Sequence, residues 1–130
     1  MKTFEKTDKE HMSHEGALAH LKAAFGYSCA GLRSVFRSEM AFRLLVLEAC
    51  ILTLLAAYLA PSFTHFVLLL IPQALALCVE LLNTAVEATV DRISLDRHPL
   101  AKKAKDAGSA AQFTAQIFLI IVWGSYFWLG

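Results

Sequence analysis

The sequence predicts an all-α integral membrane protein, in which three transmembrane helices follow an amphipathic helix at the membrane interface. Of the 130 residues, 57% are hydrophobic, which exceeds the roughly 45–50% apolar content of soluble domains. Three long apolar segments each approach or exceed the about 20 residues that a helix needs to cross a bilayer. The polar remainder is too short to cover three such segments in water. A net charge of +1 creates no field that would attract nucleic acid.

The N-terminal part divides into a tail and a helix. Residues 1–15 are rich in Lys, Glu, Asp, Thr and His, a composition that is typical of a disordered segment. Residues 16–130 then form the membrane-embedded domain. Between Gly16 and Phe36, apolar residues recur at helical spacing, which predicts an amphipathic helix that lies in the membrane interface. Its apolar positions are Leu18, Leu21, Phe25, Leu32 and Val35.

Three apolar segments are the predicted membrane spans. The first, Leu44–Ala60, is interrupted only by Glu48 and Thr53. The second, Phe66–Val90, begins as pure hydrocarbon and becomes polar in its second half. The third, Ser109–Leu129, ends in a group of aromatic residues. Glu48 either pairs with a neighbouring helix or faces the aqueous outer half of the membrane.

Lysine and arginine residues predict the orientation in the membrane. The link between the first two spans, Ala60–His65, carries none, whereas the sequence before the first span and the link between the second and third carry several. Because cytoplasmic segments carry the excess of Lys and Arg, the N-terminus and the second link are expected in the cytoplasm. The C-terminus is then periplasmic, and its aromatic residues lie at the outer interface. They are Trp123, Tyr126, Phe127 and Trp128.

A polar stripe marks the second half of the second span. At about 100° per residue, Glu80, Asn83, Glu87 and Asp91 share an arc of roughly 80° on one helix face. Glu80 lies about 10 Å deeper than Glu87. An ionisable residue near the bilayer centre costs at least about 2.5–3.5 kcal/mol, so these side chains must meet a cation, a proton or a water-filled cleft. The stripe therefore predicts a functional site.

A further acid, Glu39, precedes the first span at the same interface as Glu87. Two carboxylates without Cys or His partners suit a hard cation such as Mg²⁺, and the lysine-rich link, which is expected to run up to Ser109, suggests phosphate. The sequence contains no phosphate-binding P-loop and no protein-kinase signature. The residues by themselves also fit a non-enzymatic, proton- or cation-coupled membrane protein.

Three segments resemble the prokaryotic diacylglycerol kinase family, and the resemblance runs from about Gly26 to the end of the chain. Residues 80–87 read E-L-L-N-T-A-V-E and match the family's most specific motif, E-[IL]-[LA]-N-[ST]-A-[IV]-E. Residues 104–111 look like its second signature, and residues 39–43 resemble its E-x-A-F-R element. The resemblance implies a homotrimer of three-span subunits in the bacterial inner membrane, with active sites between subunits at the cytoplasmic surface.

The resemblance also implies an ATP-dependent lipid kinase that converts diacylglycerol to phosphatidic acid, a reaction of phospholipid biosynthesis and lipid metabolism. By position, Glu80 resembles the general base for the lipid hydroxyl. Glu39 and Glu87 resemble the carboxylates that bind Mg²⁺ with ATP, and Asn83 and Asp91 support them. The implied ATP contacts are Tyr27, Glu39, Glu87, Asp96, Arg97, His98, Lys105 and Asp106. The implied lipid contacts are Arg33, Glu80 and Ser109.

An undecaprenol kinase, which shares this fold and the E-x-x-N-x-x-x-E motif, is the alternative within the same class. The run G-S-A-A at residues 108–111 favours diacylglycerol. At residues 29–30 the chain has C-A and at residues 44–45 it has L-L, where many members of the family have other residues. These departures bear on lipid contacts and leave the carboxylates unchanged.

Overall fold

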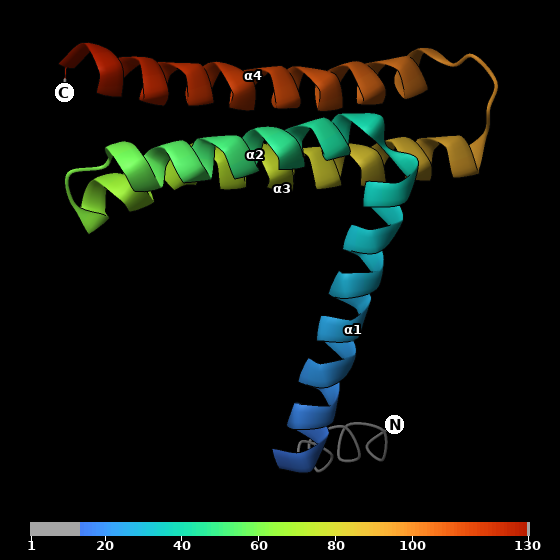
Figure 1. Ribbon diagram of the computed structural model, residues 1–130. Coiled ribbons are helices and arrows are strands. Elements are labelled where there is room, and N and C mark those ends of the chain that lie inside the picture. The colour runs from blue at the N-terminus through green and yellow to red at the C-terminus, as the bar shows by residue number, and fades with distance from the viewer. Residues whose placement is uncertain (1–13, 130) are drawn as a thin grey trace, which may run out of the picture. The chain divides into compact units, whose positions relative to one another are not determined.

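The computed structural model describes residues 14–129, and these residues form four α-helices and no strand (Figure 1). The helices are α1 (His14–Ser38), α2 (Met40–Leu59), α3 (Phe63–Ile93) and α4 (Pro99–Leu129). The predicted all-α class is confirmed, and α2, α3 and α4 are each long and apolar enough to cross a membrane. The disordered tail predicted for residues 1–15 lies outside the described residues, except for its last two, which belong to α1.

The chain divides between Ser34 and Val35 into two compact units. In the first unit, α1 is continuous, and every side chain from Gly16 to Ser34 is exposed. The helix predicted over Gly16–Phe36 is therefore present, and it extends two residues further at each end.

In the second unit, α2, α3 and α4 run alongside one another, and α3 packs against both of the others (Figure 1). α3 begins after Ser62, whose hydroxyl accepts a hydrogen bond from the backbone N–H of His65 at 3.4 Å, as an N-cap residue does. α4 begins at Pro99, a residue whose fixed φ suits the first helical position. There His98 Nδ1 accepts a hydrogen bond from the backbone N–H of Leu100 at 3.2 Å.

The start of α4 differs from the sequence prediction. A link was expected up to Ser109, but the structure has helix from Pro99 onwards, so the prediction is wrong over residues 99–108. The stretch A-K-K-A-K consists of strong helix formers, and positive charge does not by itself indicate a loop. The lysines of this stretch therefore occupy fixed positions on a helix.

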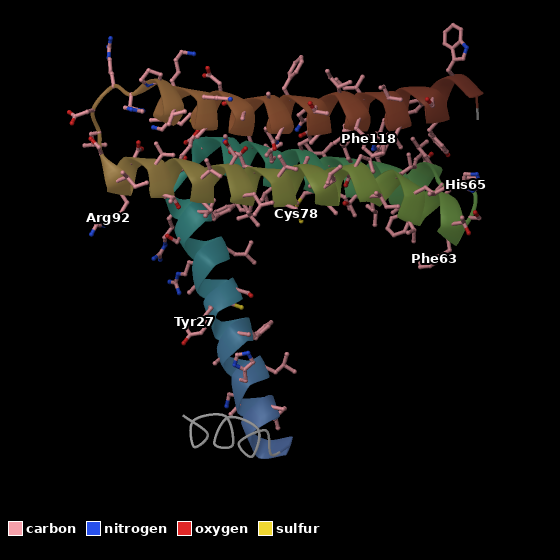
Figure 2. All side chains as sticks on the ribbon, turned by 180° about the vertical axis from the view of Figure 1, so that it is seen from behind. Tyr27, Phe63, His65, Cys78, Arg92 and Phe118 are labelled. Atoms are coloured by element: carbon pink, nitrogen blue, oxygen red, sulfur yellow. The ribbon has the colours of Figure 1, made fainter. Side chains whose placement is uncertain are left out.

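The lengths of α3 and α4 place their polar ends together. Each helix has 31 residues, which makes it about 46 Å long, whereas the hydrocarbon of a bilayer is about 30 Å thick. The short link at residues 94–98 joins the two helices, so their polar ends extend side by side beyond the apolar part. Arg92 lies at this end of α3, and Phe63 and His65 lie at the other (Figure 2).

The apolar core lies toward the opposite end of the unit, near the turn between α2 and α3. Ala56, Leu69, Leu119 and Trp123 are buried together there. One polar side chain joins this region: Gln73 is only 4% exposed, and it donates to the backbone oxygen of Leu69 at 3.0 Å and accepts from the Thr53 hydroxyl at 3.2 Å. Its polar atoms are therefore satisfied, as burial requires.

Candidate functional site

The polar stripe of α3 is buried at its deep end and exposed at its shallow end. Glu80 is 6% exposed, Asn83 and Glu87 are half-buried, and Asp91 is exposed. This gradient follows the position of each residue along the helix. The deepest acid is thus the one with the least access to water, and it is the residue that most needs a partner.

Three carboxylates from two helices lie near one another. Glu39 and Glu87 both interact electrostatically with Glu80, although Glu39 precedes α2 and the other two belong to α3. Like charges in a weakly solvated place repel strongly, so the group is stable only if a cation or a proton joins it. The structure therefore brings together the three acids that the sequence singled out.

Local structure at the start of α2 positions Glu39. Its backbone is extended, at φ −103° and ψ 115°, so the residue separates α1 from α2. Its Oε1 accepts a hydrogen bond from the Ser38 hydroxyl at 3.0 Å. The Arg43 guanidinium donates to the backbone oxygens of Phe36 and Arg37 at 3.2 and 3.0 Å, and so satisfies carbonyls that the end of a helix leaves free.

Asn83 lies where α3 and α4 approach most closely. A Cβ atom added to Gly108 on α4 would lie 2.0 Å from Asn83 Oδ1, so this position admits only glycine unless Asn83 moves. Asn83 Oδ1 is itself buried and has no hydrogen-bond partner among the described residues. A buried acceptor without a partner is costly, so this oxygen, which lies on the same helix face as Glu80 and Glu87, is available to a donor or a cation.

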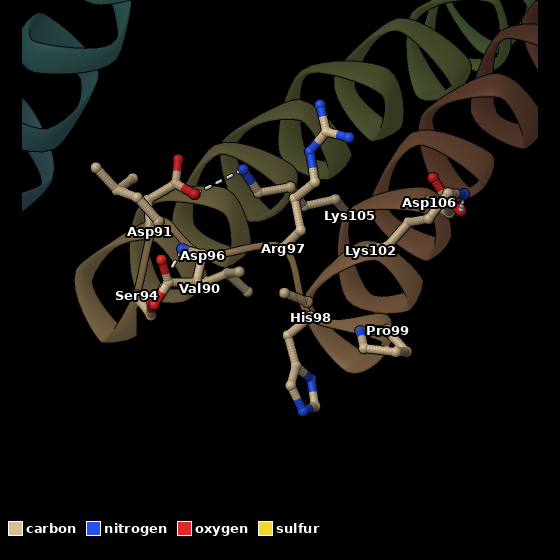
Figure 3. Close-up of a pocket in the computed structure, with 12 residues that line it drawn as sticks. Val90, Asp91, Ser94, Asp96, Arg97, His98, Pro99, Lys102, Lys105 and Asp106 are labelled. Atoms are coloured by element: carbon tan, nitrogen blue, oxygen red, sulfur yellow. Dashed lines mark hydrogen bonds and ion pairs between the residues drawn. The ribbon is translucent and has the colours of Figure 1, made fainter.

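Lys105 connects the stripe to a cavity at the α3–α4 link. Its Nζ donates to Asp91 Oδ1 at 2.6 Å (Figure 3), and it also interacts electrostatically with Glu87. The cavity measures about 710 Å³, within the range of small-molecule sites. Its charged and polar lining includes Asp91, Asp96, Arg97, His98, Lys102, Lys105 and Asp106.

The cavity wall contains one charged residue whose place at the site was not predicted from the sequence. Lys102 lines the cavity and forms an ion pair with Asp106, one helical turn along α4. The sequence placed Lys102 in a link, where it only indicated orientation. Its i, i+4 spacing from Asp106 and i, i+3 spacing from Lys105 would have identified it once the segment was read as helix.

The predicted nucleotide contact Tyr27 and the predicted lipid contact Arg33 are not in the same unit as the carboxylates. Tyr27 and Arg33 belong to α1 in the first unit, where both side chains are exposed. Ser109 is exposed on α4, directly after Gly108. The site that the second unit assembles by itself therefore consists of the three acids, Asn83 and the cavity at the link.

The donor set fits a hard cation held partly by another ligand. Among residues 14–129, no group of three His, Cys, Asp or Glu side chains is close enough to hold a metal ion unaided. Mg²⁺ in nucleotide sites is usually bound through one or two carboxylates together with substrate phosphates. Glu39, Glu87 and the unpaired oxygen of Asn83 offer such an incomplete set.

These features define a multi-span membrane protein with an acidic, partly buried candidate site that adjoins a cavity lined by side chains of both charges. A model of the family described as prokaryotic diacylglycerol kinase matches residues 26–127. A diacylglycerol kinase from Pseudomonas aeruginosa is 50% identical over 108 residues, which cover 83% of this chain and 88% of that protein. One from Helicobacter pylori is 46% identical over 105 residues, or 81% of each chain. One from Escherichia coli is 41% identical over 108 residues, or 83% of this chain and 88% of that protein. The chain therefore belongs to the prokaryotic diacylglycerol kinase family.

Proposed function

We propose that the protein phosphorylates diacylglycerol to phosphatidic acid with ATP at the cytoplasmic face of the bacterial inner membrane. The observation that carries this proposal is the burial of Glu80 beside Glu39 and Glu87. The names of the relatives support the lipid substrate. The cavity beside Lys105 supports a phosphate-bearing co-substrate, because its size is suitable and its lining includes Arg97, Lys102 and Lys105 alongside three aspartates.

We assign the role of each residue from its depth in the membrane. A lipid hydroxyl lies at the membrane interface, so Glu80, the deepest acid of the α3 stripe, accepts its proton as general base. The hydroxyl oxygen then attacks the γ-phosphorus, and the bond from this phosphorus to the leaving ADP oxygen breaks. The Lys105 ammonium moves from Asp91 to the phosphates and neutralises their charge. The nucleotide is further contacted by Asp96, Arg97, His98 and Asp106. Tyr27 provides a further nucleotide contact, and Arg33 and Ser109 contact the lipid.

Glu39 and Glu87 hold Mg²⁺ in this proposal, with Asn83 and Asp91 in support. When bound, the metal offsets the negative charge of the phosphates. The protein's own residues place the hydroxyl, the base and the phosphate in line. Such positioning is the larger part of phosphoryl-transfer catalysis.

The assembly and orientation follow the same proposal. The lysine and arginine distribution supports a cytoplasmic N-terminus and a periplasmic C-terminus, with α1 in the inner interface. Nine of the 20 residues of α2 are exposed within one chain and only two are buried, which leaves apolar surface for lipid and for further copies. We place the protein in a homotrimer whose subunits share active sites.

The test is transfer of radiolabelled phosphate from ATP to lipid by the purified protein in mixed micelles. Diacylglycerol and undecaprenol are assayed separately, with Mg²⁺ and with a chelator. We expect Mg²⁺-dependent labelling of diacylglycerol. Exclusive labelling of undecaprenol would reject the lipid assignment, and no ATP-dependent labelling of either lipid, with ion flux in liposomes instead, would reject the kinase assignment.

A further inference from the structure

Two long-range hydrogen bonds join α2 and α4 among the described residues, and one of them lies midway along the helices. No Cα atom of α2 lies within 8 Å of one of α4, whereas α3 packs against both helices. Gln116 on α4 nevertheless reaches across, and its Nε2 donates to Glu48 Oε2 at 3.2 Å. The other hydrogen bond between these helices runs from the Tyr126 hydroxyl to the backbone oxygen of Leu59 at 2.6 Å, at the far end beside the apolar core.

Both partners of the Glu48–Gln116 bond lie deep in their helices. Glu48 follows Glu39 by nine residues, or about 13 Å along α2, and Gln116 follows Lys105 by eleven residues, or about 16 Å along α4. An ionisable side chain at such a depth is expensive and is usually retained for a reason. Neither residue belongs to the motifs that define the reaction site.

The start of α2 is held by the buried side chain of Phe42 and, six residues further along, by the hydrogen bond of Glu48. Among the described residues, Glu48 is the residue of α2 nearest to Glu39 whose side chain bonds to another span. The Thr53–Gln73 bond to α3 lies further from the site, and the bonds of Arg43 go to the end of α1. The position of Glu39 beside Glu80 therefore depends in part on how firmly α2 is held at Glu48.

We infer that Glu48 and Gln116 are positioning residues for phosphoryl transfer, which hold α2 against α4 so that Glu39 stays beside Glu80. This inference rests on the proposed function, because it assigns Glu39 to the nucleotide-bound cation. The bond needs an acceptor at residue 48 and a donor at residue 116. It does not need a negative charge, so the amide of glutamine at residue 48 serves equally well.

The chain offers a matched control one helical turn away. Gln112 lies on the same face of α4 as Gln116, and its Oε1 is buried without a hydrogen-bond partner. The substitution Gln112→Leu removes an amide of the same size from the same helix and breaks no bond between α2 and α4. It separates the loss of this hydrogen bond from the general effect of removing a polar side chain within the membrane.

The experiment measures kcat, the KM for MgATP and the KM for diacylglycerol in mixed micelles, together with unfolding by a denaturing detergent. We expect Glu48→Leu and Gln116→Leu each to raise the KM for MgATP about tenfold, because a shift of about 1 Å in a positioned group has effects of this order or larger. The KM for lipid stays unchanged. Glu48→Gln and Gln112→Leu behave as the wild type. The double variant Glu48→Leu/Gln116→Leu is no worse than either single variant, because both remove the same bond.

Several results would overturn the inference. One is a wild-type KM for MgATP in Gln116→Leu. Another is a KM for MgATP in the double variant that is raised by the two single effects combined. A third is an equal rise in the KM values for MgATP and lipid that only parallels the loss of resistance to unfolding. If Gln116→Leu does not fold because it leaves the Glu48 carboxyl without its donor, Glu48→Leu and Glu48→Gln still decide, because neither leaves an unpaired ionisable group in the membrane. A wild-type protein without kinase activity would instead overturn the proposed function and this inference with it. An active wild type with insensitive variants overturns the inference alone.

Discussion

The two ends of the three-helix unit are built from the same helices and differ in the kind of side chains that they bring together. At the α2–α3 turn, Ala56, Leu69 and Leu119 form an apolar core, and the polar groups of Gln73 have partners. At the α3–α4 link, acids lie near one another, and Asn83 Oδ1 has no partner. The first end is thus an apolar core, in which the buried Trp123 Nε1 also lacks a hydrogen-bond partner among the described residues, and the second brings together acidic groups that a substrate can satisfy. Substitutions at the two ends should therefore affect different quantities.

The largest effect is expected at Glu87. We expect Glu87→Gln to lower kcat/KM for MgATP about 10²–10³-fold, the usual cost of removing one preorganised electrostatic group. Unfolding by denaturing detergent should not change. Thr89→Ala is the control, because Thr89 is exposed on the same helix and bonds only to the backbone of Ala85. Full Mg²⁺-dependent activity in Glu87→Gln would contradict the metal role.

A smaller loss is expected from Gly108→Ala on α4. The added Cβ would meet Asn83 Oδ1 and displace this side chain from the site, with a fall in kcat of about 10²-fold. Gly124→Ala on the same helix is the matched control, since a Cβ there meets nothing within 4 Å. Equal activity of the two variants would show that the close approach of α3 and α4 is irrelevant to the reaction.

Lys105→Met is expected to act on nucleotide binding. Loss of a charged donor should raise the KM for MgATP about tenfold and leave the KM for lipid unchanged. Lys103→Met provides the comparison, because Lys103 is exposed on the same turn and does not line the cavity. An equal rise in the KM for MgATP in Lys105→Met and Lys103→Met would contradict a specific contact and show a general effect of positive charge.

The apolar end should give the smallest kinetic effect and a clear stability effect. Leu69→Ala removes a side chain that is 2% exposed, and we expect it to lower the free energy of unfolding by about 2 kcal/mol. This value is at the lower end of the range for soluble cores, because lipid is itself apolar. Ile71→Ala, an exposed neighbour, should lower it much less. A change in KM for MgATP in Leu69→Ala would show that the two ends are coupled.

Much of this arrangement could be predicted from the sequence. Hydropathy identified three long apolar helices, and helical spacing placed Glu80, Asn83 and Glu87 on one face. The sequence could not show where the link before α4 ends, because lysines occur equally in loops and in the first turns of helices. It also left Glu48 without a partner, because a contact between α2 and α4 depends on how both pack on α3. Gln116 gave only a weak signal, an amide in an apolar span.

The central claim is that Glu80 takes the proton from the lipid hydroxyl, and the rate of phosphate transfer by Glu80→Gln tests it most directly. The amide cannot accept this proton, so we expect kcat to fall about 10²–10⁴-fold, the usual contribution of a general base, while MgATP binding and unfolding stay as in the wild type. A Glu80→Gln variant that phosphorylates diacylglycerol at the wild-type rate would contradict the account.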